Sequence, residues 1–153
     1  CPVNIKCLAY KKNTVFLFPV KNKKKYIPLY NIVVGIIYKK NHFLISKRKK
    51  NGMLANLWEL PGGKIEKNEN SIECLRREIK EETDLTIKVK QYIGNINHQY
   101  SHFKINVKLY KCQYISGQAK PLSSQQVKWI NIKNINKFTF PTATHKLFKL
   151  LKD

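Results

Sequence analysis

The sequence predicts an α+β domain in which helices pack on the faces of a mixed β-sheet. The hydrophobic patterns follow one another in the order strands, helix, strands, helix, which is typical of an α/β/α layer arrangement. Of the 153 residues, 42% are hydrophobic and 25% are charged, the balance of a globular protein. The length is sufficient for one domain with its own core, and no segment is repeated.

Two strands and a glycine turn are expected in the first half of the chain. Residues 30–38, YNIVVGIIY, are β-branched and almost continuously apolar, which favours a buried strand. Residues 39–41 are a polar turn, and residues 42–47 are expected to pair with the first strand as a hairpin. After a basic loop, the mostly apolar residues 53–60 lead into residues 61–63, PGG, a turn with mobile backbone geometry.

An amphipathic helix is expected over residues 71–83. Ser71 can cap its N-terminus, because a hydroxyl accepts a hydrogen bond from a free amide of the first turn. Glu73 lies in that first turn, where a negative charge complements the helix dipole. The expected apolar face consists of Ile72, Leu75 and Ile79, with Cys74 beside them.

The second half of the chain again places strands before a helix. Residues 86–96 and 103–115 alternate between apolar and polar positions, which predicts two strands. Residues 127–132 are expected to form a short strand. Pro141 then begins a helix over residues 142–152, because proline is favoured in a first helical turn.

The chain is strongly basic, with 30 Lys and Arg against 9 Asp and Glu and a formal net charge of +21. Such a charge indicates a polyanionic partner, most simply nucleic acid. Codon bias in an AT-rich genome would also enrich Lys, Asn and Ile, and composition does not separate the two explanations. No run of ~18 apolar residues predicts a membrane span. We expect a cytoplasmic protein of bacterial type that associates with the nucleoid.

Four cysteines lie at positions 1, 7, 74 and 112. Nothing in the sequence indicates secretion, so free thiols or metal ligands are expected rather than a disulfide scaffold. Cys74 and Cys112 lie within expected elements and are interpreted as small buried hydrophobic residues. Because the first residue is Cys1 and not Met, we expect a fragment or a processed product.

Most of the acidic residues are concentrated in and around the expected acidic helix. Glu78 and Glu82 lie one turn apart on the same face, with Glu81 beside them. Adjacent carboxylates repel one another unless a cation lies between them, and oxygen-only ligands favour Mg²⁺ or Mn²⁺. Glu69 is placed to pair with Arg77. The unit is suited to metal-assisted attack of water on a pyrophosphate. The alternative is a solvent-exposed helix face stabilised by ion pairs four residues apart, and the spacing of these charges fits that alternative poorly.

Residues 62–85, GGKIEKNENSIECLRREIKEETDL, resemble the Nudix box. The family has Gly where this chain has Asp84, a residue that can also adopt a left-handed turn. The resemblance implies the α/β/α sandwich of that family and a structural pair between Glu69 and Arg77. It also implies a Mg²⁺ or Mn²⁺ site whose ligands and catalytic residues are the Gly62 carbonyl, Glu78, Glu81 and Glu82, with Glu78 as a base.

The segments outside the box resemble the C-terminal domain of MutY-type adenine DNA glycosylases. Residues 51–61, NGMLANLWELP, and residues 98–103, HQYSHF, are similar to segments of that domain, as are residues 140–141, FP, and His145. The resemblance implies a fragment of an enzyme that removes adenine paired with 8-oxoguanine. This part would recognise the lesion, and its partner would be DNA containing 8-oxoguanine.

The glycosylase resemblance assigns lesion recognition to three loop residues. 8-Oxoguanine carries a proton on N7, which the Ser101 hydroxyl or a backbone carbonyl can accept. Tyr100 or His102 would stack on the base or lie beside it. The alternative is that these are ordinary loop and core residues. The side chains expected to contact phosphates are lysines such as Lys47, Lys49 and Lys50.

Cys1 and Cys7 resemble the last two ligands of the glycosylase's 4Fe–4S loop. Because two thiolates do not hold a four-iron cluster, the cluster is expected in the intact parent and not in this fragment. The expected organisation is a remnant of the iron–sulfur loop in residues 1–9, a basic linker in residues 10–28 and a Nudix-like domain in residues 29–153.

Two other functions fit the same sequence. With an active box, the protein would be a Mg²⁺-dependent pyrophosphohydrolase of the MutT type, acting on 8-oxo-dGTP. With an inactive box, it would be a basic nucleic-acid binder whose affinity depends steeply on salt and not on a lesion.

Overall fold

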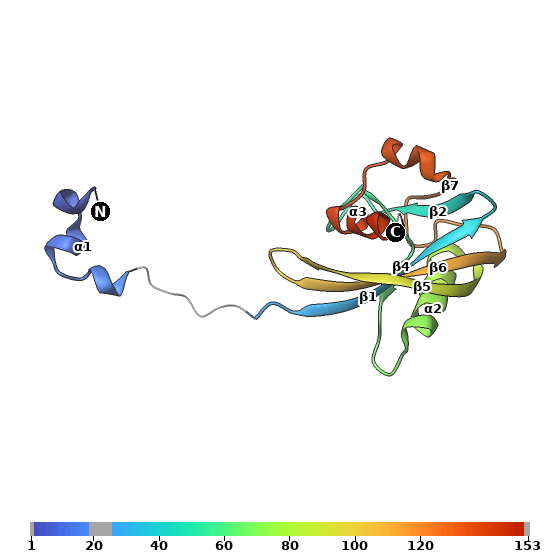
Figure 1. Ribbon diagram of the computed structural model, residues 1–153, viewed down its shortest axis with the longest axis horizontal. Coiled ribbons are helices and arrows are strands. Elements are labelled where there is room, and N and C mark those ends of the chain that lie inside the picture. Colours follow the sequence, from blue (N-terminus) through green and yellow to red (C-terminus); the bar gives the residue numbers. More distant parts are fainter. Residues whose placement is uncertain (1, 19–25, 152–153) are drawn as a thin grey trace.

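The computed structural model describes residues 2–18 and 26–151, and its central feature is a seven-stranded mixed sheet (Figure 1). The main strand order is β3-β2-β1-β6-β5, while β4 also pairs with β1 and β7 with β2. The strands are β1 (Leu29–Lys39), β2 (His42–Lys47), β3 (Trp58–Glu59), β4 (Gly62–Lys64), β5 (Thr86–Gln99), β6 (Lys104–Ser116) and β7 (Gln126–Ile130).

Two longer helices pack on opposite faces of this sheet, which confirms the predicted α/β/α layers. They are α2 (Ser71–Thr83) and α3 (Thr142–Lys149), and the 3₁₀ helix η3 (Ile132–Lys137) precedes α3. Across the described ranges, no helix has both the length and the apolar character needed to cross a membrane. The short helices of the N-terminal segment are η1 (Asn4–Lys6), α1 (Leu8–Lys11) and η2 (Val15–Leu17).

Strand β1 is the centre of the fold. It pairs in parallel with β6 from Leu29↔Lys104 to Tyr38↔Gln113, and antiparallel with β2. Both of its faces are covered, so its residues Val33, Ile36 and Ile37 are fully buried. This explains why the sequence of β1 is almost continuously apolar.

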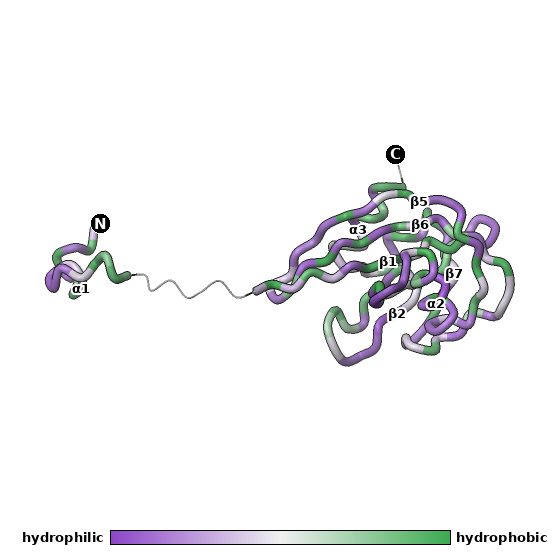
Figure 2. Tube along the Cα trace, turned by 90° about the horizontal axis from the view of Figure 1, so that it is seen from below, coloured by the Kyte–Doolittle hydropathy of each residue, from purple (hydrophilic) through white to green (hydrophobic). Residues whose placement is uncertain are grey.

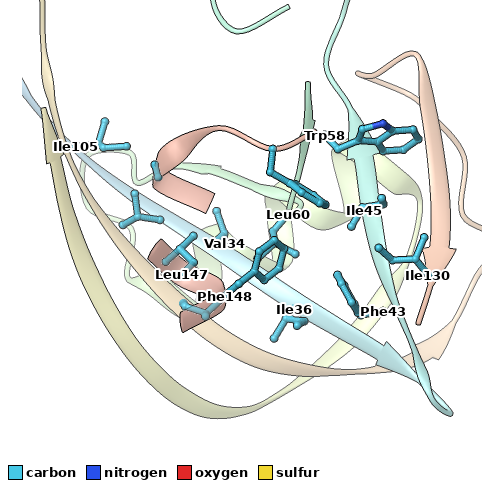
Figure 3. Close-up of a cluster of buried hydrophobic side chains, with 14 residues drawn as sticks. Val34, Ile36, Phe43, Ile45, Trp58, Leu60, Ile105, Ile130, Leu147 and Phe148 are labelled. Carbon is cyan, nitrogen blue, oxygen red and sulfur yellow. The ribbon is translucent and has the colours of Figure 1, made fainter. Parts of the chain in front are cut away.

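Alternate residues of β1 belong to two different hydrophobic cores, as expected for a strand whose side chains alternate between faces. Val34 and Ile36 face α3 and pack in a cluster with Phe148 (Figure 3). Val33 and Ile37 face α2 and pack with its buried residues. Along β5 and β6 in Figure 2, in contrast, the colour changes repeatedly between hydrophobic and hydrophilic.

The structure corrects several details of the expected elements. Asn70, not Ser71, is the N-cap of α2, and its side chain accepts hydrogen bonds from the amides of Ile72 and Glu73. Ile72 is 39% exposed and therefore lies outside the buried face. The last helix ends at Lys149, and a 3₁₀ turn that the sequence did not predict precedes it.

The expected division into a remnant, a linker and a domain stays a prediction. β1 begins at Leu29, and the segment before it includes residues outside the described ranges. Cys1 also lies outside them. Cys7 is a half-buried free thiol, while Cys74 and Cys112 are free and buried.

Candidate active site

The turn between β3 and β4 depends on glycine at position 62. Gly62 has φ +142°, and an added Cβ would lie 2.2 Å from the carbonyl oxygen of Val33. Only glycine accepts both this backbone geometry and this approach. The Gly62 amide then points at α2 and donates a 3.0 Å hydrogen bond to Oε2 of Glu82.

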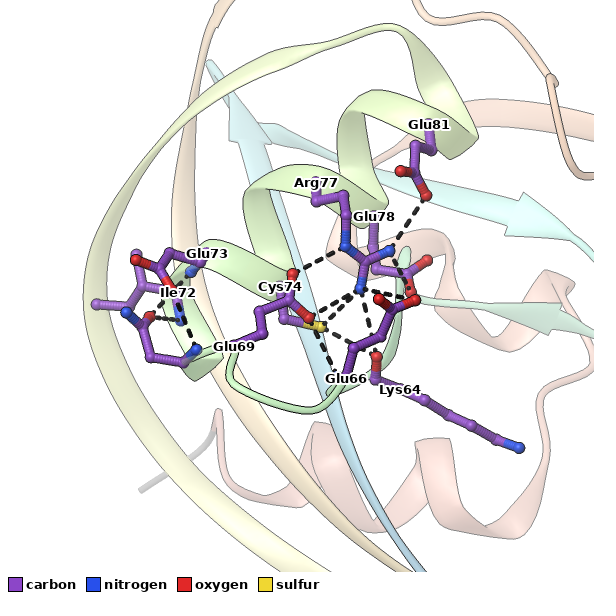
Figure 4. A network of polar contacts seen from close by, with 10 residues as sticks. Lys64, Glu66, Glu69, Ile72, Glu73, Cys74, Arg77, Glu78 and Glu81 are labelled. Atoms are coloured by element: carbon purple, nitrogen blue, oxygen red, sulfur yellow. Dashed lines mark hydrogen bonds and ion pairs between the residues drawn. The ribbon is translucent and has the colours of Figure 1, made fainter.

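Arg77, in the middle of α2, organises the carboxylates around it (Figure 4). Its Nε and Nη2 donate to the two oxygens of Glu69 at 2.8 and 2.9 Å, a bidentate ion pair. Its Nη1 donates to Glu78 at 3.1 Å and to Glu81 at 3.2 Å. The pair holds the loop before α2 against the helix, and it lowers the pKa of Glu69 to about 2.

Glu78 and Glu81 differ in how firmly they are held. The Glu78 side chain is 18% exposed and lies on Gly63, because a Cβ at that glycine would come within 2.2 Å of the Glu78 carboxyl carbon. The Glu81 side chain is 60% exposed, and its described contact is the one with Arg77. Glu78 therefore lies in a fixed position, whereas Glu81 is accessible from solvent.

Glu82 carries the carboxyl of the site whose pKa is raised most. Its pKa is raised to about 7, chiefly by burial; the hydrogen bond from the Gly62 amide opposes this shift, and the nearby charges of Glu59 and Glu78 contribute to it. The sequence argument had three carboxylates that need a cation to remain ionised together. In the structure, the charge of Glu78 does raise the pKa of Glu82, although burial is the larger cause of the shift.

A divalent cation fits the donor set of this helix. Within the described ranges, no three acidic, histidine or cysteine side chains are grouped closely enough to hold a metal ion as they now lie. Glu78 and Glu81 contact Arg77, and Glu82 contacts the Gly62 amide. The donors are nonetheless all oxygens, which Mg²⁺ and Mn²⁺ prefer, and a cation would relieve the penalty that raises the pKa of Glu82.

A cavity of about 490 Å³ opens beside the glycine turn. Gly62 and Gly63 line one side of it, and aromatic side chains from β1 and from the β5–β6 connection line another. Helix α3 contributes Thr144, a buried polar residue. The lining residues used below are Tyr30, Lys64, Tyr100, Phe103, Thr144 and Leu147.

Of the three predicted lesion-recognition residues, only Tyr100 lines the cavity. Tyr100 lines the cavity, with its ring 4.8 Å from that of Phe103 and 4.6 Å from that of His98. Ser101 and His102 are exposed and do not line the cavity. The ring of Tyr100 is thus placed to stack on a group in the cavity, whereas the Ser101 hydroxyl and the His102 imidazole are outside the cavity lining.

The sequence interpretation missed an ion pair in the cavity wall. Arg48 and Glu59 both line the cavity, and their side chains meet at 2.5 Å. Burial raises the pKa of Glu59, and the Arg48 guanidinium opposes this shift. A signal was present, because Glu59 is the first acidic residue of the chain and directly precedes the glycine turn.

A mixed sheet between two helices, with a glycine turn against a glutamate-bearing helix, is the architecture of a Nudix domain. The family described as NUDIX domain matches residues 32–150, and the chain belongs to this family. An 8-oxo-dGTP diphosphatase of Buchnera aphidicola subsp. Schizaphis graminum is 34% identical over 125 residues, which cover 79% of this chain and 95% of that protein. The crystal structure of a MutT protein from Methanosarcina mazei matches with a TM-score of 0.75 and 25% identity, covering 82% of this chain and 94% of that one.

These comparisons overturn the expectation of a glycosylase fragment. An adenine DNA glycosylase of the same Buchnera strain is 26% identical over 152 residues, which cover 99% of this chain and 42% of that protein. The diphosphatase, in contrast, is more similar and is covered almost from end to end. The expectation was wrong because it rested on short flanking segments, whereas the similarity to the diphosphatases extends over most of the chain. The iron–sulfur cluster and the lesion-containing DNA were inferred from the same resemblance and lose that support, while the nucleoid association stays a prediction.

Proposed function

We propose that this protein is a Mg²⁺- or Mn²⁺-dependent pyrophosphohydrolase that acts on an oxidised purine nucleoside triphosphate such as 8-oxo-dGTP. The observation that carries the proposal is that the cavity and the acidic helix share one wall. Gly62 and Gly63 line the cavity, and the same two residues contact Glu82 and Glu78. A nucleotide whose base enters the cavity therefore has its phosphates beside the carboxylates.

The cavity has the shape and chemistry of a base-binding site. Its volume is within the range of small-molecule sites, and its lining is mainly apolar with a few polar groups. Tyr100 and Phe103 offer ring surface to a flat base. Thr144 and the Arg48–Glu59 pair supply the polar groups that would orient it. The relatives named 8-oxo-dGTP diphosphatase support an oxidised guanine as that base.

The reaction is the attack of water on a phosphorus atom of the triphosphate chain. A P–O bond forms between the water oxygen and that phosphorus, and the P–O bond that bridges the α- and β-phosphates breaks, so the products are a nucleoside monophosphate and pyrophosphate. Glu78, fixed between Arg77 and Gly63, holds the proton that the water loses. Glu78, Glu81, Glu82 and the Gly62 carbonyl would hold the cation, which when bound neutralises phosphate charge and lowers the pKa of its water.

The proposal is tested by measuring pyrophosphate release from a panel of nucleoside triphosphates, with and without Mg²⁺. We expect the highest kcat/KM for 8-oxo-dGTP, and a loss of at least about 100-fold in kcat for Glu81→Gln. Glu73→Gln is the matched control, because it removes one charge from the same helix while glutamine still completes the capping box. Turnover by the wild type no higher than by Glu81→Gln would eliminate the proposal.

A further inference from the structure

Charge is distributed very unevenly along this chain. Eight of the nine acidic residues lie between positions 59 and 84, and the ninth is Asp153. Only five of the 30 basic residues lie in the same interval, so the other 25 lie in parts of the chain that are almost free of acid. Codon bias explains a high lysine content, but it does not place the lysines around any particular site.

Four lysines flank the cavity, and we call them the basic rim. Lys49 and Lys50 are exposed in the loop that follows β2, between the cavity-lining residues Arg48 and Met53. Lys64 lines the cavity itself, and its Nζ lies 3.9 Å from the ring centroid of Tyr30. The fourth member is Lys146 on α3, whose Nζ lies 3.4 Å from Nδ1 of His98.

The basic rim carries positive charge that the described part of the chain does not neutralise. The salt bridges among the described residues use only Arg48, Arg77, Lys80 and Lys120 as cations. Lys146 instead lies beside His98, whose pKa is lowered first by burial and then by the charge of Lys146. Uncompensated positive charges around one opening form an attractive site for a chain of phosphates.

The cavity at the centre of the rim favours a single strand over a duplex. Bases in a duplex are stacked and paired, whereas a single strand can turn one base away from its neighbours. Tyr100 and Phe103 present ring surface for such a base, and stacking on aromatic side chains is typical of proteins that bind single strands. The rim lysines come from three separate parts of the chain, the loop after β2, β4 and α3, and a strand offers them more phosphates than a free nucleoside triphosphate does.

We propose that the basic rim binds the phosphates of a single-stranded nucleic acid, one base of which enters the cavity. The proposal rests on the proposed function only in using the same cavity for a base. It does not require that the strand be hydrolysed. It predicts that a strand and a nucleotide compete for one site.

The test is a titration of the protein with a fluorescent single strand of about 15 nucleotides, as DNA and as RNA, and with the matching DNA duplex. Binding is measured in EDTA at several salt concentrations, and a nucleoside monophosphate is added as competitor. The variants are the triple substitution Lys49→Gln/Lys50→Gln/Lys146→Gln and the charge-matched control Lys40→Gln/Lys88→Gln/Lys90→Gln. The control lysines are exposed and do not line the cavity.

We expect the wild type to bind the single strand more tightly than the duplex and to release it when the monophosphate is added. The rim variant should bind about tenfold more weakly at 0.1 M salt, with a salt slope reduced by about 2, because each lost phosphate contact removes about 0.7 from the slope. Equal losses in both variants, tighter duplex binding or an absence of competition would overturn the proposal. Pyrophosphate release is measured separately with Mg²⁺, so a failure of the enzyme activity is distinguishable from a failure of strand binding.

Discussion

Gly62 and Gly63 are adjacent glycines with different roles. At Gly62, the obstacle to a side chain is the backbone of β1, and the φ of +142° adds strain. At Gly63, the obstacle is the end of the Glu78 side chain, which can rotate away. The first glycine therefore serves the fold, and the second keeps a carboxylate in place.

This difference predicts opposite outcomes for two alanine substitutions. Gly62→Ala should lower the free energy of unfolding by more than about 2 kcal/mol, because backbone must move. Gly63→Ala should cost less than about 1 kcal/mol but reduce kcat at least about tenfold, because it displaces Glu78. Urea denaturation and pyrophosphate release measure the two effects. Equal loss of stability in both variants would contradict this assignment.

Glu82 predicts a pH dependence of stability in the cation-free protein. Its pKa is raised to about 7 from the ordinary 4.5, so the folded state binds the proton more tightly than the unfolded state. The stabilisation is complete below pH 4.5 and is lost as pH rises towards 7, by up to about 3 kcal/mol. Glu69 and Asp84, whose pKa values are lowered to about 2, act only below that window.

The measurement is thermal unfolding in EDTA at pH values between 4.5 and 8. Glu82→Gln should remove this fall, and the difference between the two proteins cancels the opposite contribution of His98, whose pKa is lowered. Addition of Mg²⁺ above pH 7 should restore stability to the wild type more than to the variant, because a bound cation stabilises the folded state. Parallel pH profiles for the two proteins would refute the role given to Glu82.

At the scale of elements, α2 shows how much local sequence determines. The C-terminal end of the helix was predicted correctly, because its apolar spacing is regular and Asp84 follows it in the left-handed conformation, with φ 58°. The wrong N-cap arose because Asn70 and Ser71 are both good capping residues. The position of Glu73 resolves the choice, since a capping box needs an acid three residues after the cap, which identifies Asn70.

The cap of α2 can be tested by itself. Asn70→Ala should reduce the free energy of unfolding by about 1 kcal/mol, because the amides of Ile72 and Glu73 lose their acceptor. For a protein of this size the expected decrease in Tm is about 2–4 °C. Asn70→Ser keeps a capping oxygen and should retain most of the stability. A Tm decrease in Asn70→Ser equal to that in Asn70→Ala would show that the cap contributes nothing.

At the scale of the whole molecule, sequence patterns could not predict the cavity. Its walls come from β1, β4, β6 and α3, which are brought together by the parallel pairing of β1 with β6. Hydrophobic alternation predicts that a segment is a strand, but it does not identify the partner of that strand. The carboxylates of α2 were found because they are neighbours in sequence, whereas the cavity-lining residues Tyr30, Lys64 and Thr144 are far apart in it.

The two helical layers have separate tasks, since α3 lines the cavity and α2 carries the carboxylates. Leu147 of α3 is 3% exposed and lines the cavity, and Ile79 of α2 is fully buried next to Glu78. Leu147→Ala and Ile79→Ala should each cost about 2–5 kcal/mol in stability, because each leaves a void in a packed core. Their kinetic effects should differ. Leu147→Ala loosens the cavity and should raise KM, whereas Ile79→Ala lets α2 shift and should lower kcat.

The comparison requires that both variants be folded under the assay conditions. Urea denaturation gives the folded fraction, and steady-state kinetics at a temperature where that fraction exceeds about nine tenths give kcat and KM. A change in KM for Leu147→Ala alone, and in kcat for Ile79→Ala alone, is the expected result. If both substitutions change the same kinetic parameter, α3 does not serve binding alone and α2 does not serve catalysis alone. The structural change at either helix would then reach the other through the β1–β6 pair that lies between them.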